Sequence, residues 1–472
     1  MNDGSSPIPD RLCDVVMKGG ITSGVVYPAA ITELAKSYRF KSIGGTSAGA
    51  IAAALTAAAE LGRNRPGGGF ACLEELPAEL ARNLLSLFQP VRATRSAFAV
   101  LVACLGCRPL WRKALGVLTA LVAHHWPWTL AGLLVGWGVD RALVAVLAAD
   151  PPWVVGWVLG VGVGLVSALL LTAVVFVAQA WRGLSANGFG LCSGMPDGER
   201  RTESTPLTIW LTALLDKMAG LPEGAGPLTF GDLWGLARDA SEEQKDELRA
   251  KPDLRQVNLE VMTTNLMHGR PYRIPFLNNL FFFRETDLRP LFPSAVVDWM
   301  VERSQPANHP DNAQEGLRHL PHPADLPVVV AVRLSLSFPF LLSAVPLYAV
   351  DFRRPLNQAA SRDHKPLLYE RCWFSDGGIG SNFPIHFFDG LLPGHPTFGI
   401  NLRSFPPNDD GSEVEVAPDD LALCVDFPQA PQGEVLPDWN RFGGLLGFPG
   451  AIVQAMQSWV DSTQIQLPGY RD

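Results

Sequence analysis

A serine between two closely spaced glycines is the first feature of this sequence that is suited to chemistry. Gly45-Thr46-Ser47-Ala48-Gly49 has the form G-x-S-x-G, which is typical of a nucleophile elbow, a sharp turn from a strand into a helix. A serine there sits in strained backbone, and the two glycines remove collisions with the neighbouring strand and helix. The first amides of the following helix would stabilise negative charge developing beside the serine. Ser47 is therefore a candidate nucleophile.

A glycine-rich segment lies shortly before the elbow. Lys18-Gly19-Gly20-Ile21-Thr22-Ser23-Gly24 directly follows the apolar run Asp14-Val15-Val16-Met17. It has neither the G-K-[ST] ending of a Walker loop nor the G-x-G-x-x-G pattern. Beside a serine elbow, such a loop is suited to an oxyanion hole, in which the backbone N–H groups of Gly19, Gly20 and Ile21 face the ester oxygen. The alternative is a plain turn between a strand and a helix.

These motifs need a strand before each turn and a helix after it. The sequence predicts a strand at residues 14–17, a helix over 25–37, a second strand ending at the Gly44-Gly45 pair, and a helix of small residues from Ala48 to Ala59. Strands that alternate with helices in this way predict an α/β fold with parallel strands.

The two motifs together resemble the patatin-like phospholipase family, over about residues 12–60 and 255–400. That family pairs its serine with the aspartate of a D-G-[GA] motif, and here Ser375-Asp376-Gly377-Gly378 follows the predicted strand Arg371–Phe374. Residues 333–340 are similar to the serine-proline segment that lines the family's pocket. One departure is that the family's loop usually has three consecutive glycines, whereas here Ile21 follows two.

The resemblance implies a three-layer α/β/α fold with a mainly parallel central sheet, and two apolar stretches between its halves predict that an inserted two-helix transmembrane hairpin interrupts it. The resemblance also implies a serine lipid acyl hydrolase that cleaves the acyl esters of membrane phospholipids, with Ser47 as nucleophile and Asp376 as base, and the hairpin would anchor this enzyme in the membrane. Gly377 and Gly378 would let the backbone turn tightly beside Asp376. No cofactor and no metal are expected.

Two apolar stretches separate the halves of the resemblance. Residues 153–181 contain no charge and exceed the ~20 residues that a bilayer helix requires. Residues 114–138 are also uncharged but contain His124, His125 and Pro127. The alternative frame 129–149 would bury Asp140 and Arg141 at considerable cost.

The number of membrane spans follows from the need for one active site, and their direction follows from the flanking charges. If Ser47 and Asp376 form one site, both flanks of the hairpin lie on the same side of the membrane, so the number of spans is even. Arginine and lysine are concentrated before and after the two predicted spans, at positions 92, 95, 108, 112, 113, 182, 200 and 201. The expected protein is a two-pass protein of a bacterial inner membrane. By the positive-inside rule, its catalytic part is expected to lie on the cytoplasmic side.

The spacing of glycines also predicts how the second span packs. Gly156, Gly160 and Gly164 repeat every four residues and form a close-packing face, either for the first span or for another copy of the protein in a homo-oligomer.

The predicted organisation is residues 1–110 as the first part of the catalytic domain, 111–182 as the hairpin, 183–404 as the second part and 405–472 as a C-terminal extension. Within the second part, residues 230–251 are expected to be helical and 305–327 to form a long surface insertion. The net charge of −8, without a basic block, argues against nucleic acid as a partner.

Three other functions fit parts of the pattern. An α/β-hydrolase would use a histidine base, for which His386 is the best placed, followed by His268 and His395. An acyltransferase would differ only in the acceptor. A membrane scaffold or lipid-binding protein that has kept the fold would be catalytically silent.

Overall fold

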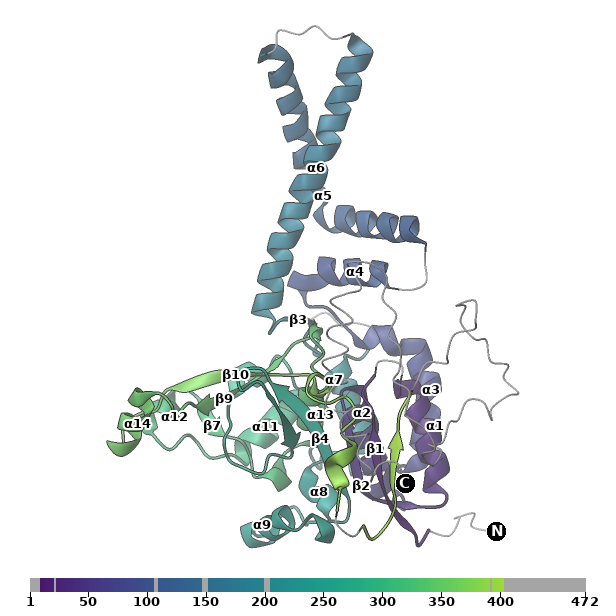
Figure 1. Cartoon of the computed structure of the whole chain (residues 1–472), viewed down its shortest axis with the longest axis vertical. Coiled ribbons are helices and arrows are strands. Elements are labelled where there is room, and N and C mark those ends of the chain that lie inside the picture. The colour runs from purple at the N-terminus through teal and green to yellow at the C-terminus, as the bar shows by residue number, and fades with distance from the viewer. Residues whose placement is uncertain are drawn as a thin grey trace, which may run out of the picture. The chain divides into compact units, whose positions relative to one another are not determined.

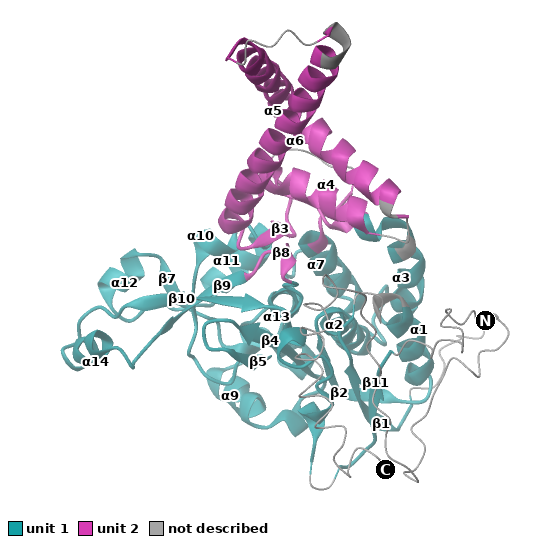
Figure 2. Ribbon diagram, turned by 45° about the horizontal axis from the view of Figure 1, so that its top comes forward, with its two compact units in different colours: residues 1–85, 208–338, 345–472 teal, residues 86–207, 339–344 magenta. Residues whose placement is uncertain are grey.

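The structure is a computed structural model of the 472-residue chain and describes residues 9–20, 23–105, 109–146, 152–198, 204–390 and 393–402. The chain forms two compact units (Figure 2). Unit 1 comprises Met1–Leu85, Thr208–Phe338 and Val345–Asp472, and unit 2 comprises Ser86–Leu207 and Pro339–Ala344. The predicted extension, 405–472, lies outside the described residues.

Unit 1 is built on a nine-stranded sheet in the order β11-β1-β2-β4-β10-β9-β6-β7, with β5 paired to β4 (Figure 1). The pairs β11-β1, β1-β2 and β2-β4 are parallel, and the remaining strands pair antiparallel. The predicted α/β fold is confirmed, and the sheet is parallel in the half that carries Ser47. The strands are β1 (Leu12–Met17), β2 (Arg39–Thr46), β4 (Asn258–Asn265), β5 (Arg270–Ile274), β6 (Phe282–Arg284), β7 (Leu317–His319), β9 (Val345–Val350), β10 (Tyr369–Ser375) and β11 (Thr397–Ile400).

The parallel strands are covered on both faces. A Cβ built on Gly45 would lie 2.2 Å from the Gly49 carbonyl oxygen of helix α2 (Ala48–Leu61), whereas one on Gly44 would lie 3.0 Å from Phe387 of η6 (Ile385–Phe388). Successive side chains of a strand point to opposite faces, so α2 and η6 lie on opposite sides of β2. This arrangement accounts for the apolar, two-sided burial of β1.

Helix α2 is the central helix of unit 1. It is buried along nearly its whole length, which is why its sequence is mainly alanine and other apolar residues, with Glu60 near its end as a buried carboxylate. The other helices of this part of the chain are α1 (Ser23–Ala35), α3 (Phe70–Asn83), α7 (Leu207–Met218), α8 (Phe230–Trp234), α9 (Glu242–Ala250), α10 (Glu285–Leu288), α11 (Ser294–Glu302), α12 (Pro310–Gln314), α13 (Val328–Ser335) and α14 (Pro355–Arg362).

Two expectations for unit 1 were wrong. Residues 230–251 form two helices instead of one, because Gly235 has φ +84 and ends α8, after which Ser241 caps α9. The stretch 305–327 is not a surface insertion. It contains β7, which pairs with β6, and Leu317 and Leu326 are buried in the core.

Unit 2 contains the apolar stretches. Helices α5 (Leu110–Val146) and α6 (Trp153–Ala186) run side by side (Figure 1), and by length and composition both could cross a membrane. Helix α5 bends at His125, two residues before Pro127. The unit also contains α4 (Arg95–Cys104) and the parallel strands β3 (Gly190–Cys192) and β8 (Phe340–Leu342).

The two long helices pack through small residues. A Cβ on Gly136 would lie 2.6 Å from the Gly164 Cα, and one on Gly132 would lie 2.5 Å from the Ala168 Cα. The carboxylate of Asp140 lies 3.0 Å from a Cβ built on Gly160. Gly160 and Gly164 therefore face the first long helix of the same chain, one of the two arrangements that their spacing predicts.

Candidate active site

Ser47 lies between the end of β2 and the start of α2, with φ 55 and ψ −129. Non-glycine residues rarely adopt positive φ, and such strain is concentrated at functional sites. Glycine is required on both sides of this turn. A Cβ on Gly45 would overlap the Gly49 carbonyl, and one on Gly49 would lie 2.4 Å from the Met17 carbonyl oxygen. Ser47 is thus held in the backbone conformation of an elbow.

Asp376 directly follows β10 and is 3% exposed. Its Oδ1 accepts a 2.7 Å hydrogen bond from the Gly378 amide, whereas Oδ2 is buried and makes no hydrogen bond of good geometry within the described ranges. Burial raises the pKa of this carboxyl to about 6, against the opposing effect of hydrogen bonding by the Ser47 hydroxyl and the Gly378 amide. A buried acceptor oxygen beside a hydroxyl is the arrangement expected of a general base.

The turn after Asp376 packs directly onto the elbow. A Cβ on Gly377 would lie 2.4 Å from the Thr46 hydroxyl oxygen and 2.0 Å from the Met262 carbonyl oxygen. Only glycine fits there. The close contact arises because β10 pairs with β4, which in turn pairs with β2. The D-G-G motif and the elbow, more than 300 residues apart in the sequence, therefore meet at one edge of the sheet.

The glycine-rich loop lies against the same serine. A Cβ on Gly19 would lie 3.0 Å from the Ser47 Cβ and 2.3 Å from the Asn382 Oδ1. The Gly19 amide donates to the Asn382 carbonyl at 2.8 Å, so in this state it is not directed at a substrate oxygen. Gly20 follows in the loop, and Ile21 lies outside the described residues.

Lys18 contributes to the site through its backbone. Its carbonyl accepts a 2.5 Å hydrogen bond from the Tyr27 hydroxyl, and its amide donates to the Ile400 carbonyl at 3.2 Å. These bonds fix the start of the loop between α1 and β11.

The end of α13 and the segment after it support both candidate residues in ways that the sequence did not reveal. The Ser335 hydroxyl accepts a 3.0 Å hydrogen bond from the Ser47 amide. The Ser337 carbonyl accepts from the Asp376 amide at 3.0 Å and from the Ser375 hydroxyl at 2.9 Å. Arg333, 1% exposed, donates to the Ser337 hydroxyl at 2.7 Å. The resemblance indicated a pocket segment here but not these contacts.

Two of the three histidines considered as alternative bases have partners elsewhere. His268 contacts the Tyr272 hydroxyl at 2.5 Å, and His395 contacts Asp14 at 2.9 Å. The third, His386, lies on η6, across β2 from α2.

Comparison with known proteins agrees with this geometry. The model of the family described as "Patatin-like phospholipase" matches residues 15–100, which include the glycine-rich loop and the elbow. A protein of Rhizobium meliloti (strain 1021) named "RpoH suppressor" is 38% identical over 517 residues, covering 98% of this chain and 77% of that protein. The chain belongs to the patatin-like phospholipase family. Membership supports a lipid hydrolase as its class, whereas the relative's name states no reaction.

For a patatin-like phospholipase, the site has the parts that acyl transfer needs. A strained serine, a buried carboxyl beside it and a glycine-rich loop converge at the carboxyl ends of parallel strands. The described residues contain no group of three or more histidine, cysteine, aspartate or glutamate side chains suited to a metal ion.

Proposed function

We propose that this protein is a membrane-anchored serine lipid acyl hydrolase, of the phospholipase A or lysophospholipase type, that acts through a Ser47–Asp376 dyad. The observation that carries the proposal is the packing of the D-G-G turn on the elbow, where the space between Gly377 and Thr46 admits no side chain. Family membership supports the hydrolase class.

In the proposed reaction, Asp376 accepts the Ser47 hydroxyl proton while Oγ attacks the acyl carbonyl carbon. Backbone amides of the loop at residues 19–21 and of the start of α2 stabilise the resulting oxyanion. For the Gly19 amide to take part, it must leave the Asn382 carbonyl. The tetrahedral intermediate then breaks its bond to the leaving alkoxide, which takes the proton from Asp376. Water, deprotonated by Asp376, releases the fatty acid and restores the Ser47 hydroxyl.

The substrate is proposed to be membrane phospholipid, since α5 and α6 suit a two-pass anchor in a bacterial inner membrane. An even number of spans leaves both parts of the catalytic unit on one side. The positive charges that flank the hairpin favour the cytoplasmic side. A homo-oligomer through the face of Gly156, Gly160 and Gly164 remains a prediction, and it would require Gly160 and Gly164 to leave α5 of the same chain.

The test is the release of free fatty acid from vesicles of mixed bacterial phospholipids. We expect Ser47→Ala and Asp376→Asn each to lose all but a few per cent of the wild-type rate. The matched controls are Ser37→Ala and Asp363→Asn, which change exposed residues of the same types and should leave the rate unchanged.

Other outcomes separate the alternatives. Wild-type rates in Ser47→Ala would refute the serine mechanism. Acyl transfer to an added alcohol, without fatty acid, would indicate an acyltransferase. No serine-dependent reaction from folded, membrane-inserted protein would favour a scaffold.

A further inference from the structure

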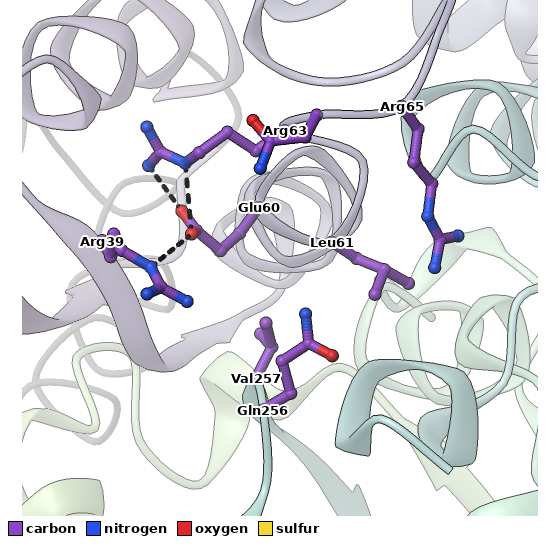
Figure 3. Close-up of a pocket in the computed structure, with 8 residues that line it drawn as sticks. Arg39, Glu60, Leu61, Arg63, Arg65, Gln256 and Val257 are labelled. Carbon is purple, nitrogen blue, oxygen red and sulfur yellow. Dashed lines mark hydrogen bonds and ion pairs between the residues drawn. The ribbon is translucent and has the colours of Figure 1, made fainter. Parts of the chain in front are cut away.

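A polar cavity lies in unit 1, far from Ser47 along the sheet. Its volume is about 380 Å³, and Figure 3 shows arginine side chains arranged around it. It is lined by Arg39, Glu60, Leu61, Arg63, Asn64, Arg65, Gln256 and Val257.

The charges around this cavity do not balance. Glu60 is 7% exposed and is bound by Arg63, with nitrogen–oxygen distances of 2.6 and 3.2 Å. Arg39 approaches Glu60 only to 3.9 Å, and its side chain is 46% exposed. Arg65 donates to the Ala219 carbonyl at 2.9 Å but makes no ion pair in the described part of the chain. One carboxylate thus faces three guanidinium groups, which leaves an excess of two positive charges.

Neutral hydrogen-bond donors complete the lining. The side-chain amides of Asn64 and Gln256 border the cavity and have no hydrogen-bond partner among the described residues. Buried Leu61 and Val257 form apolar wall. Guanidinium groups bind phosphate through paired N–H donors, and amides add uncharged donors to the remaining oxygens.

We propose that this cavity is a binding site for the phosphate group of a small phosphorylated ligand. Arg39 and Arg65 supply the charge, and Asn64 and Gln256 supply further hydrogen bonds. The phosphate could belong to a soluble metabolite or to the headgroup of an anionic lipid, since the recognised chemistry is the same.

The site is separate from the catalytic centre but is built on the same elements. Arg39 begins β2, Glu60 and Leu61 end α2, and Val257 immediately precedes β4. Ser47 joins the opposite ends of β2 and α2, so an eight-residue strand separates Arg39 from the elbow, or roughly 25 Å at the usual rise per residue.

The binding experiment uses the full chain in phosphatidylcholine nanodiscs, in a Ser47→Ala background so that no lipid is consumed. Inorganic pyrophosphate is titrated by calorimetry into this protein and into an Arg39→Gln/Arg65→Gln variant. The control is Lys36→Gln/Arg82→Gln, which removes the same charge from exposed positions outside the cavity. A second arm repeats the titration in nanodiscs that also contain phosphatidate.

We expect saturable binding that the Arg39/Arg65 variant weakens at least about tenfold, because two charge-assisted contacts are lost, and that the control leaves unchanged. Equal affinity in both nanodiscs would identify a soluble phosphate ligand. Competition by phosphatidate that disappears in the Arg39/Arg65 variant would identify a lipid headgroup.

The absence of saturable binding in both arms, or equal loss in the two double variants, would overturn the proposal. Because no turnover is measured, the outcome does not depend on whether the protein is a hydrolase. A thermal melt without ligand checks that both variants are folded, as expected for substitutions at exposed side chains.

Discussion

Burial of the ionised Asp376 carboxylate lowers the stability of the folded protein. Its pKa is raised to about 6 by burial, above the ordinary value of 3.8, so the ionised form is less stable in the folded protein than in the unfolded chain. The folded state binds more protons between these two values, and stability therefore falls as pH rises from 3.8 to about 6. Above pH 6 the full cost is present, about 3 kcal/mol for a shift of this size.

Asp376→Asn is accordingly expected to lower the activity and to raise the stability of the folded protein. The rate of fatty-acid release should fall about 10²- to 10⁴-fold, because the general base is lost. Melting temperature measured against pH should show the variant more stable than wild type above pH 6, with the difference shrinking toward pH 4. A variant that is less stable at every pH would mean that the native contacts favour the carboxylate. Asp363→Asn is the control.

The pH dependence of catalysis follows from the same residue. The base must be ionised, so kcat/KM for a soluble ester should rise with pH up to about 6 and level off above it. The ordinary pKa of a histidine lies close to that of Asp376, so the pH profile alone does not distinguish the two bases. The measurement is therefore made on wild type and on His386→Ala. An unchanged profile and rate in His386→Ala supports the dyad, whereas loss of activity would identify a histidine base.

The sequence predicts the role of a residue where that role depends on neighbours close to it in the chain. The elbow could be predicted because Gly45, Ser47 and Gly49 fall within five residues, although only the clash at Gly45, with the Gly49 carbonyl, is local. The role of Ser335 could not, because its hydrogen bond to the Ser47 amide spans 288 positions and leaves no local pattern. The sequence also could not show that the Gly19 amide donates to the Asn382 carbonyl, because the two residues are brought together only by folding. The glycine-rich loop alone therefore predicts a free amide at Gly19 for the oxyanion hole.

At the scale of elements, the site depends on how closely β1, β2 and α2 approach one another. Gly49→Ala would place a methyl group 2.4 Å from the Met17 carbonyl oxygen and 2.8 Å from that of Lys18. Because the obstructing atoms are backbone, we expect a loss of folded protein and a lower melting temperature. The matched control is Gly390→Ala, where a Cβ meets nothing within 4 Å. Equal stability of the two variants would contradict the close approach.

Element types were predicted better than their limits and pairings. The alternation of strands and helices up to α2 follows from hydrophobic patterning. The break at Gly235 was missed because one glycine in a helical pattern does not by itself specify a left-handed conformation. β7 was missed because a three-residue strand within a polar, proline-rich stretch gives almost no periodic signal.

At the scale of the whole molecule, the active site constrains the topology. Ser47 and Asp376 come from opposite sides of the segment that contains α5 and α6, so one site requires that both flanks lie on the same side of any membrane. We predict that tags at both termini are protected from protease added outside intact spheroplasts, whereas a tag near Asp150 is cleaved.

Lysed spheroplasts provide the control, since all three tags should then be cleaved. Protection of the Asp150 tag in intact spheroplasts would contradict two spans. Hydropathy predicted the two long helices because apolar composition alone is a strong signal. It could not predict that residues 339–344 belong to the same unit, because that depends on a pairing between distant strands.

The pairing of β3 with β8 makes the segment that contains α5 and α6 difficult to remove. Pro339–Ala344 belong to unit 2, and β8 begins three residues after Ser337, whose carbonyl holds the Asp376 amide. Excision of residues 86–207 would delete β3 and leave β8 with an unpaired edge next to the catalytic segment. A form of the chain without α5 and α6 will therefore require redesign of β8 as well as excision of residues 86–207.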